Sequence, residues 1–482
     1  MKKENRVLKI VSIVVALVFL VSAITCIGMV LSMNVLPAKY LQLMLGILIP
    51  VILIVFGLLL LRKTPKVIKV VAIILAVMLI TGFCVGINYL YNTFEFMGSI
   101  SSKDHEIENY YVIVKKDSKY ESLEDLDKQS MGIVVEDNKN FTNVTLDIHS
   151  KVEVVDKEYN DSVAMTKDLL NGQIESSLIS NAQYEVLKES DDTFESKVKI
   201  IYTKSIKTLT QDIKKDADVT AEPFNIYISG IDTFGNISTR SRSDVNIVMT
   251  VNPSTKRILL TTIPRDYYVK LHGTTGYKDK LTHAGVYGID MSVKTIEDLL
   301  KIDINYYIRV NFNTLIDVVD VIGGVDVYSE KDFATWGNPD IKFKKGLNHL
   351  DGKNALIFSR ERKTFAEGDR QRGKNQQAVI TAIINKVTQS KTLVTKYNQI
   401  LNSLDGSFQT NLPTNKIYSL IKLQLNDMPK WNVESISLDG SGKREYTYSY
   451  RGQKLYVMEP DQATVINAQS KIKQIESINQ EN

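Results

Sequence analysis

Three long apolar segments dominate the first hundred residues of the chain. They run roughly over residues 10–33, 40–61 and 70–94, and none of them contains a charged residue. Each is long enough to cross a bilayer as a helix. The first is too long, and too closely followed by the others, to be a cleaved signal peptide. The pattern therefore predicts a membrane anchor of three transmembrane helices over residues 1–100.

Beyond this anchor, short apolar runs alternate with helical stretches. Residues 101–108 are polar and are expected to form a linker. Strand-like runs such as YYVIVKK and VKIIYTK, separated by helical patterns, predict a small α/β domain over residues 109–215, here called the accessory domain. It resembles half of a solute-binding-protein fold and contains no cluster typical of a site. We therefore expect a packing or interaction module.

Residues 222–482 predict a larger α/β domain with a central mixed sheet flanked by helices. Its first strand, FNIYISGI, ends directly before Asp232, and a hairpin joined through Asn252-Pro253-Ser254 ends before Arg265. Helices are predicted over residues 284–300, 313–321 and 369–389, and strands over residues 305–310, 325–328 and 355–360. Ligands in such folds collect outside the carboxyl ends of strands, which places Asp232, Arg265, Arg360 and Arg362 at a candidate site.

The distribution of basic residues predicts the orientation in the membrane. Four basic residues precede the first apolar segment and four lie between the second and third, whereas only Lys39 lies between the first and second. The positive-inside rule then places the N-terminus in the cytoplasm and everything after residue 95 outside.

The net charge of the outer part argues against a nucleic-acid-binding protein. The whole chain has a formal charge of +4, but residues 1–100 contain nine Lys and Arg against two Asp and Glu, so residues 101–482 carry −3. An acidic outer part does not bind nucleic acid non-specifically. Its arginines must therefore matter through local clusters.

Cysteine and histidine chemistry is disfavoured as well. Both cysteines, Cys26 and Cys84, lie within apolar segments, so the outer part has no disulfide, thiolate nucleophile or cysteine metal site. The five histidines show neither an HExxH motif nor paired metal-ligand spacing. We expect each histidine to be structural or exposed.

The densest group of arginines lies in residues 355–379. Arg360 and Arg362 are two residues apart, so on the predicted strand both would point to one face. Asp369, Arg372 and Gln376 are spaced i, i+3, i+7 along one helical face. Guanidinium groups from two elements would then bind a polyanion between them. The alternative is a solvated basic face, which is the usual meaning of a charge run.

Several longer motifs, in a fixed order, resemble a known family. They are GIDTFGNISTRSRSDVNIVMTVNP, LTTIPRDYYV, KLTHAGVYG, YYIRVNFNTLIDVVDVIGGVDV and KGLNHLDGKNALIFSRERKTFAEGDRQRGKNQQAV. They cover residues 222–390 without a large gap and resemble the LytR-CpsA-Psr family of cell-wall glycopolymer transferases. The three apolar segments and the accessory domain are similar to the branch of this family found in capsule-producing streptococci, which attaches capsule.

The resemblance implies a phosphotransferase at the cell membrane of a Gram-positive bacterium. Such an enzyme moves an anionic or capsular glycopolymer from an undecaprenyl-pyrophosphate carrier to peptidoglycan. It would be a multi-pass protein with a cytoplasmic N-terminus and an extracellular catalytic domain. Mg²⁺ is the implied cofactor, with Mn²⁺ as the alternative, and capsule synthesis or export proteins are implied partners.

The resemblance also implies a role for each matching residue. The magnesium-linked acids would be Asp232 and Asp244. The pyrophosphate-binding side chains would be Arg242, Arg265, Lys280, Arg360, Arg362, Arg372 and Gln376. Catalysis would involve Asp369, Arg360 and Arg362, with Asp369 accepting the proton of the incoming hydroxyl. Bidentate arginines and a carboxylate-held hard cation suit a pyrophosphate. Asp369 could instead only favour a helix N-terminus.

Two functions of other classes stay open. The first is a membrane-anchored transcriptional regulator or attenuator, although the predicted cytoplasmic pieces, of about nine and about eight residues, are too short for a helix-turn-helix unit. The second is a receptor that binds polyprenyl phosphate without turnover, which the solute-binding resemblance suggests. Water in place of the acceptor hydroxyl would add a pyrophosphatase side activity.

Overall fold

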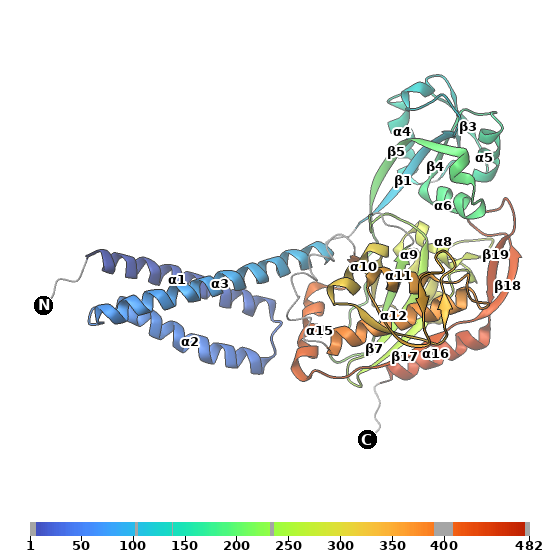
Figure 1. Cartoon of the computed structure of the whole chain (residues 1–482). Coiled ribbons are helices and arrows are strands. Elements are labelled where there is room, and N and C mark those ends of the chain that lie inside the picture. Colours follow the sequence, from blue (N-terminus) through green and yellow to red (C-terminus); the bar gives the residue numbers. More distant parts are fainter. Residues whose placement is uncertain (1–5, 102–104, 137, 232–235, 390–407, 478–482) are drawn as a thin grey trace. The chain divides into compact units, whose positions relative to one another are not determined.

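The computed structural model describes residues 6–101, 105–136, 138–231, 236–389 and 408–477. The chain divides into two compact units, whose elements are labelled in Figure 1. The first unit comprises residues 1–99, 388–405 and 413–430. The second comprises residues 100–387, 406–412 and 431–482.

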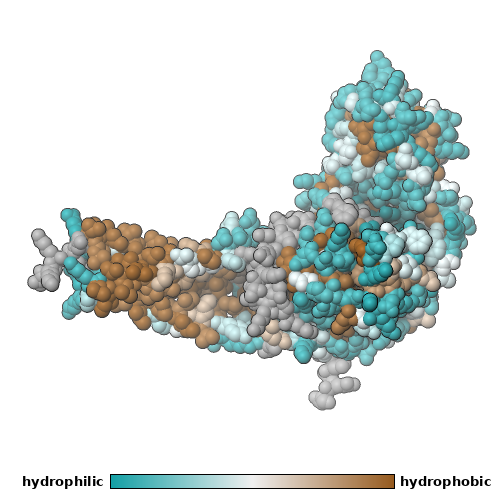
Figure 2. Space-filling model, in the orientation of Figure 1, coloured by the Kyte–Doolittle hydropathy of each residue, from teal (hydrophilic) through white to brown (hydrophobic). Residues whose placement is uncertain are grey.

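The first unit is built on three apolar helices. They are α1 (Arg6–Met33), α2 (Ala38–Leu60) and α3 (Lys66–Ser101), and the shorter α15 (Thr414–Asp427) belongs to the same unit. The rings of Phe19 and Phe83 pack between the helices with centroids 6.0 Å apart. Many leucine, isoleucine and valine side chains remain exposed, and they form the brown surface in Figure 2. All three helices are long and apolar enough to cross a membrane, as predicted.

The second unit begins with a five-stranded sheet in the order β3-β2-β4-β1-β5. Strands β3, β2 and β4 are parallel, whereas β1 is antiparallel to β4 and β5. The strands are β1 (His105–Lys115), β2 (Ser130–Ile133), β3 (Val155–Glu158), β4 (Ser176–Ser180) and β5 (Val198–Leu209). The helices are η1 (Glu124–Leu126), α4 (Lys139–His149), α5 (Ser162–Leu170), α6 (Asn181–Ser190) and α7 (Phe194–Lys197).

Strand β1 explains why this sheet is covered on both faces. Tyr110 and Val112 belong to one core cluster, together with Val144 of α4, whereas Ile113 belongs to another, together with Leu169 of α5. Successive side chains of a strand point to opposite faces, so both faces are apolar. The α/β class predicted for this part of the chain is confirmed. β1 begins within the stretch predicted as a linker, and β4 was not predicted.

A six-stranded mixed sheet, in the order β16-β11-β6-β7-β8-β17, forms the centre of the larger part. The predicted hairpin is present, because β7 is antiparallel to both β6 and β8. β11 runs parallel to β6, and β17 runs parallel to β8. The strands are β6 (Phe224–Ile231), β7 (Ser243–Asn252), β8 (Arg257–Thr262), β11 (Tyr306–Val310), β16 (Phe408–Thr410) and β17 (Asn432–Ser437).

Helices cover both faces of this sheet. On one face, Leu259 is buried in a cluster with Ile296 of α9 and Ile472 of α16. On the other, Gln377 of α12 donates a hydrogen bond to the Ile436 carbonyl of β17 at 2.5 Å. The helices are α8 (Leu281–Tyr287), α9 (Ile289–Leu300), α10 (Phe312–Val321), α11 (Gly352–Arg360), α12 (Asp369–Gln389) and α16 (Gln462–Glu476).

Four two-stranded sheets complete the described fold. They pair β9 (Tyr268–Val269) with β10 (Asp279–Lys280), β12 (Val325–Ser329) with β15 (Gly346–Leu350), β13 (Phe333–Ala334) with β14 (Lys342–Phe343), and β18 (Gly440–Glu445) with β19 (Leu455–Pro460). The second unit therefore has the α/β architecture, with a central mixed sheet flanked by helices, that the sequence predicts.

The strand predicted over residues 355–360 is wrong, because this segment belongs to helix α11. Asp351 caps the helix by accepting a hydrogen bond from the Asn354 backbone N–H at 2.8 Å. A short apolar run does not distinguish a strand from a buried helix. Arg360 therefore ends a helix and Arg362 follows it in a turn, so the two arginines do not share a strand face.

The single helix predicted over residues 284–300 is two helices, α8 and α9, which meet at Gly288. Its φ of 129° lies in a region that side chains with a Cβ rarely adopt. A Cβ at this position would also approach Asp290 Oδ1 to 2.6 Å. The break is therefore specified by the glycine.

Glu106 of β1 joins the two large sheets of the second unit. Its Oε1 accepts hydrogen bonds from Arg309 Nη1 of β11 at 2.7 Å and from the Ile289 backbone N–H at 3.1 Å. Its Oε2 accepts from Arg240 Nε at 3.2 Å. Glu106 and Arg309 are each 1% exposed. Breaking a buried ion pair by removing one partner costs about 3–5 kcal/mol, so this contact is a strong link between the sheets.

Candidate active site

The candidate site lies where the β7–β8 hairpin meets the beginning of α12. Arg265 follows β8, and its Nη1 lies 2.6 Å from Asp244 Oδ1 of β7. The Thr282 hydroxyl of α8 donates to the same oxygen at 3.0 Å. The side chains of Arg265 and Asp244 are 10% and 12% exposed. One buried ion pair is thus positioned by the end of β8, the beginning of β7 and helix α8.

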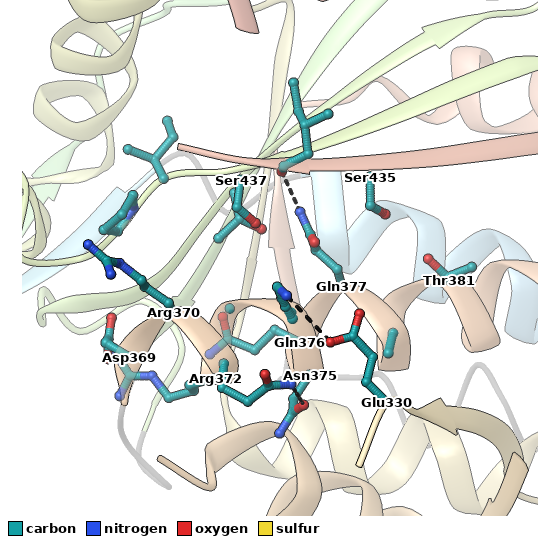
Figure 3. Close-up of a pocket in the computed structure, with 18 of the residues that line it drawn as sticks. Glu330, Asp369, Arg370, Arg372, Asn375, Gln376, Gln377, Thr381, Ser435 and Ser437 are labelled. Carbon is teal, nitrogen blue, oxygen red and sulfur yellow. Dashed lines mark hydrogen bonds and ion pairs between the residues drawn. The ribbon is translucent and has the colours of Figure 1, made fainter. Parts of the chain in front are cut away.

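Helix α12 contributes three predicted residues to the same place. Asp369 is its first residue, and Arg372 and Gln376 follow on the same face, as predicted (Figure 3). Arg372 Nη2 lies 2.5 Å from Asp369 Oδ1. Together with Asp244 and Arg265, these residues line a pocket of about 690 Å³.

The wall of the pocket opposite α12 contains three hydroxyl side chains. They belong to Thr262 of β8 and to Ser435 and Ser437 of β17, and Figure 3 shows the two serines across from the helix. Ser435 and Ser437 pair in register with Leu260 and Thr262 of the parallel neighbour, so they share one face of the sheet. Small hydroxyl side chains leave room in the pocket and offer hydrogen bonds, which suits a polar ligand.

Two of the carboxylates that line the pocket, Asp244 and Asp369, have pKa values displaced in opposite directions. Burial alone would raise the pKa of Asp244, but Arg265, Arg372 and Arg242 outweigh it and hold that pKa below its ordinary value. Burial dominates at Asp369 and raises its pKa, although the charge of Arg372 opposes this. Asp244 therefore stays ionised, whereas Asp369 takes up a proton more readily than an ordinary aspartate does.

Two more predicted cations surround Arg265. Lys280 Nζ of β10 lies 3.0 Å from Asp266 Oδ1, and Arg242 Nη1, just before β7, lies 3.3 Å from Glu189 Oε2. The Lys280 and Arg242 side chains are 6% and 13% exposed. The structure therefore brings Arg242, Arg265 and Lys280 into one buried cluster of alternating charges.

Some residues of this cluster were not predicted. Glu185 and Glu189 of α6, in the accessory domain, pair with Arg242 at 3.4 and 3.3 Å. These ion pairs agree with the expected packing or interaction module, but the sequence does not predict that the module contacts the arginines of the candidate site. His283 of α8 belongs to the cluster too, because its Nε2 lies 2.8 Å from Glu189 Oε2. A signal for it exists in the sequence, since it lies three residues after Lys280 in the KLTHAGVYG motif. The two glutamates belong to no recognised motif, and only the fold brings them here.

Arg360 and Arg362 occupy different surroundings from the buried cluster. The Arg360 guanidinium lies 4.1 Å from the centre of the Phe312 ring, and its side chain is exposed. Arg362 is exposed too, but its positive charge lowers the pKa of Asp369, so it lies within electrostatic range of the pocket. Neither residue is among those that line the pocket.

The predicted metal ligands can be placed only in part. Asp232 lies outside the described residues, whereas Asp244 is buried in the pocket. Within the described part of the chain, no group of three or more His, Cys, Asp or Glu side chains has the arrangement of a metal site. Mg²⁺ often uses one or two carboxylates and completes its coordination with substrate phosphates and water. An ionised Asp244 fits that chemistry.

Comparison with known proteins gives consistent matches to this part of the chain. A model of the LytR_cpsA_psr family matches residues 183–472. The polyisoprenyl-teichoic acid–peptidoglycan teichoic acid transferase TagU of Bacillus mycoides is 35% identical over 257 residues, which is 51% of this chain and 82% of that protein. TagU of Bacillus anthracis is 35% identical over 249 residues, 50% of this chain and 79% of the relative.

A solved structure is also similar. The crystal structure of TagV from B. subtilis is 30% identical, with a TM-score of 0.45, and the match covers 54% of this chain and 98% of that one. The family match spans more than half of the 482 residues and includes the β7–β8 hairpin, Arg265 and helix α12. The chain therefore belongs to the LytR-CpsA-Psr family.

Proposed function

We propose that this protein transfers an anionic or capsular glycopolymer from an undecaprenyl-pyrophosphate carrier to peptidoglycan. The observation that carries the proposal is the pocket in which Arg265 and Arg372 lie beside Asp244 and Asp369, two carboxylates with oppositely displaced pKa values. The names of the TagU relatives, which describe transfer from a polyisoprenyl carrier to peptidoglycan, support the same chemistry.

Arginine side chains would bind the donor substrate. Arg242, Arg265 and Arg372 are close enough to Asp244 for their charges to act on its pKa. A pyrophosphate entering the pocket would accept charge-assisted hydrogen bonds from such guanidinium groups, each contributing about 1.5–3 kcal/mol. The carrier's polyprenyl chain and the glycan would extend from this headgroup.

Asp369 would accept a proton in the transfer step. The acceptor hydroxyl of peptidoglycan attacks the phosphorus attached to the glycopolymer, and its proton passes to the Asp369 carboxylate. A new P–O bond forms, and the bond to the bridging oxygen breaks, so undecaprenyl monophosphate leaves. Phosphoryl transfer depends mainly on positioning and charge neutralisation, which the buried charges around Arg265 supply. Water in place of the hydroxyl would give pyrophosphate hydrolysis as a side activity.

Mg²⁺, or Mn²⁺ in its place, belongs to this proposal. Asp244, together with Asp232, would hold the ion, which would neutralise charge on the phosphates when bound.

The reaction would take place on the outer side of the cell membrane of a Gram-positive bacterium. Basic residues concentrated before α1 and between α2 and α3 support a cytoplasmic N-terminus, with the second unit outside. Peptidoglycan would then be accessible to the pocket. Capsule synthesis or export proteins would deliver the lipid-linked donor.

The test is reconstituted transfer with the full chain in detergent or vesicles. Polyprenyl-pyrophosphate-linked glycan, a peptidoglycan fragment and Mg²⁺ are supplied, and the linked product is measured. Arg265→Ala and Asp369→Asn should abolish most of the product. Arg444→Ala is the matched control, because Arg444 is an exposed arginine of β18 outside the pocket lining. Binding of the donor without any product from the unmodified chain would contradict the transferase and favour a receptor.

A further inference from the structure

The Glu189 carboxylate, near the end of α6, contacts four basic side chains: two arginines, a lysine and a histidine. Its Oε1 accepts hydrogen bonds from Arg265 Nη2 at 3.0 Å and from Lys280 Nζ at 2.8 Å. Its Oε2 lies 2.8 Å from His283 Nε2 and 3.3 Å from Arg242 Nη1. The Glu189 side chain is only 12% exposed. One residue of the accessory domain thus touches several of the predicted pyrophosphate-binding groups.

A buried series of hydrogen bonds supports Glu189 from the other side. His283 Nδ1 lies 2.6 Å from Asp279 Oδ1, and both side chains are 0% exposed. Asp279 also accepts hydrogen bonds from the Ser449 hydroxyl and, at 2.9 Å, from the Ser449 backbone N–H. Ser449 Oγ lies 2.9 Å from the Tyr287 hydroxyl. Glu189 is therefore held by enclosed groups that have fixed positions.

The charge state of His283 fits this arrangement. Burial alone would lower its pKa, but Asp279 and Glu189 outweigh burial and raise the pKa to about 9. The imidazole is therefore protonated at neutral pH and donates to both carboxylates. Burial would likewise raise the pKa of Glu189, but His283, Lys280 and Arg265 hold it below its ordinary value. Glu189 is therefore ionised at neutral pH.

The arginines that Glu189 holds retain donors for a ligand. A guanidinium group has five N–H donors, and Arg265 directs Nη1 at Asp244 and Nη2 at Glu189. Arg242 Nε lies 3.4 Å from Glu185 Oε2 and Arg265 Nε lies 3.7 Å from Asp266 Oδ1, and neither forms a hydrogen bond among the described residues. Arg265 therefore retains N–H donors beyond the two that Asp244 and Glu189 accept. An anionic ligand could accept from these remaining donors.

We propose that Glu189 is a positioning residue that the accessory domain supplies to the active site. It fixes Arg242, Arg265 and Lys280 in the orientation that binds the pyrophosphate of the donor. This inference rests on the proposed function for its catalytic consequence, whereas its effect on anion binding is independent of turnover. The accessory domain is then part of the site, and the site is incomplete without it.

The contrasting possibility is that Glu189 occupies the place of the phosphate and blocks it. The geometry favours positioning, because a blocking carboxylate has to leave when substrate arrives. Withdrawal of Glu189 would break its contacts with Arg265, Lys280 and His283 at the same time. Each of these three groups would lose one of the carboxylates that face it. The arrangement is that of a fixed support.

The first test is binding of inorganic pyrophosphate to the full chain, measured by calorimetry. Loss of a negative charge should by itself strengthen anion binding. Positioning predicts the opposite: Glu189→Gln should weaken pyrophosphate binding by roughly tenfold, the value of one charge-assisted hydrogen bond. Glu189→Asp keeps the charge and should recover part of the affinity. Glu195→Gln is the matched control in the accessory domain, because Glu195 is half exposed and pairs with Lys188 at 2.9 Å.

The second test is transfer activity. Glu189→Gln should lower kcat/KM for the lipid-linked donor by roughly a hundredfold, as expected when binding groups move by about 1 Å. The KM for the peptidoglycan acceptor should not change. NMR of the His283 imidazole provides a readout that does not depend on activity, because its pKa should fall in Glu189→Gln while the chain stays folded by circular dichroism.

The outcomes distinguish a positioning Glu189 from a blocking one, and they test the positioning role separately from the transferase function. Tighter pyrophosphate binding or faster transfer in Glu189→Gln would overturn positioning and identify a blocking carboxylate. Unchanged binding and an unchanged imidazole pKa would also overturn it. If the unmodified chain binds pyrophosphate but transfers nothing, the transferase fails, and weaker binding in Glu189→Gln still supports the positioning role.

Discussion

Arg265 and Asp244 lie 2.6 Å apart where β8 ends and β7 begins, and both are almost enclosed. The same guanidinium group contacts Glu189 at 3.0 Å and lies 3.7 Å from Asp266. Three carboxylates from three parts of the chain therefore fix its plane. The orientation of Arg265, and not only its charge, is specified by the fold.

Replacement of Arg265 by lysine is expected to impair anion binding severely. Lysine keeps the positive charge but provides a single ammonium group, which cannot reach Asp244, Glu189 and a phosphate together. Loss of one or two charge-assisted hydrogen bonds, at about 1.5–3 kcal/mol each, weakens pyrophosphate binding roughly ten- to a hundredfold or more. Titration calorimetry measures the change, and Arg444→Lys should bind as the unmodified protein does. Equal affinities for both variants would contradict this account of the site.

Replacement of Asp369 by asparagine should separate catalysis from binding. The amide fits the same space but accepts no proton, so kcat should fall by roughly 10²–10⁴ while pyrophosphate binding is retained. Because burial raises the pKa of Asp369, the acid limb of the kcat–pH profile should lie above the ordinary aspartate range in the unmodified chain. A variant with normal turnover would assign the proton transfer to another group.

Protonated His283 should stabilise the fold in a defined pH range. Its pKa is about 9 in the folded protein, against about 6.5 in an unfolded chain. The folded state thus binds the proton more tightly, so the contribution is fully present below about pH 6.5, declines above that value and is lost once the pH passes about 9. Its upper limit is on the order of 3 kcal/mol. Urea denaturation between pH 6 and pH 10 should show this decline in the unmodified chain and a smaller one in His283→Gln.

A methyl group on Gly285 of α8 should disturb the beginning of β7. A Cβ there would lie 2.6 Å from the Ser241 carbonyl oxygen and 2.9 Å from the Ser243 backbone nitrogen. Neither backbone atom can move without displacing Arg242 and Asp244. We expect Gly285→Ala to lose about 1–3 kcal/mol of stability and to bind pyrophosphate more weakly. Gly337→Ala is the control, because a Cβ at Gly337 has no neighbour within 4 Å; similar melting temperatures for both variants would refute the prediction.

Removal of divalent cations should reduce transfer. We expect a chelator to abolish most product formation, and either Mg²⁺ or Mn²⁺ to restore it. Asp244→Asn should require a higher Mg²⁺ concentration for half-maximal rate, since it removes one of the two predicted carboxylates. Activity that persists in the chelator would exclude the metal from the proposed mechanism.

The sequence predicts the large elements well because their signals are local. Apolar length identifies α1 to α3, and two β-rich runs joined by a turn identify the β7–β8 hairpin. The spacing of Asp369, Arg372 and Gln376 correctly places them on one face of α12. These predictions succeed because a helix or strand repeats its geometry every few residues.

Other parts depend on contacts between distant segments. The apolar run in α11 has no period that separates strand from helix, and the helix packs through Phe358 against the distant residues Phe333 and Phe343. Glu189 is likewise an ordinary residue of an ordinary helix until the fold places it beside Arg265. No pattern within α6 could have assigned it to the site, because its partners lie about 50 to 95 residues further along the chain.

The Glu106–Arg309 pair has a consequence for how this protein can evolve. If recombination replaced β1 and the rest of the accessory domain with those of a distant relative, Arg240 and Arg309 could lose their buried counter-charge. Most hybrid chains would then fold poorly. We therefore expect descendants of this chain to diversify the accessory domain by point substitution, and domain shuffling to succeed only where an acidic residue is inherited at position 106.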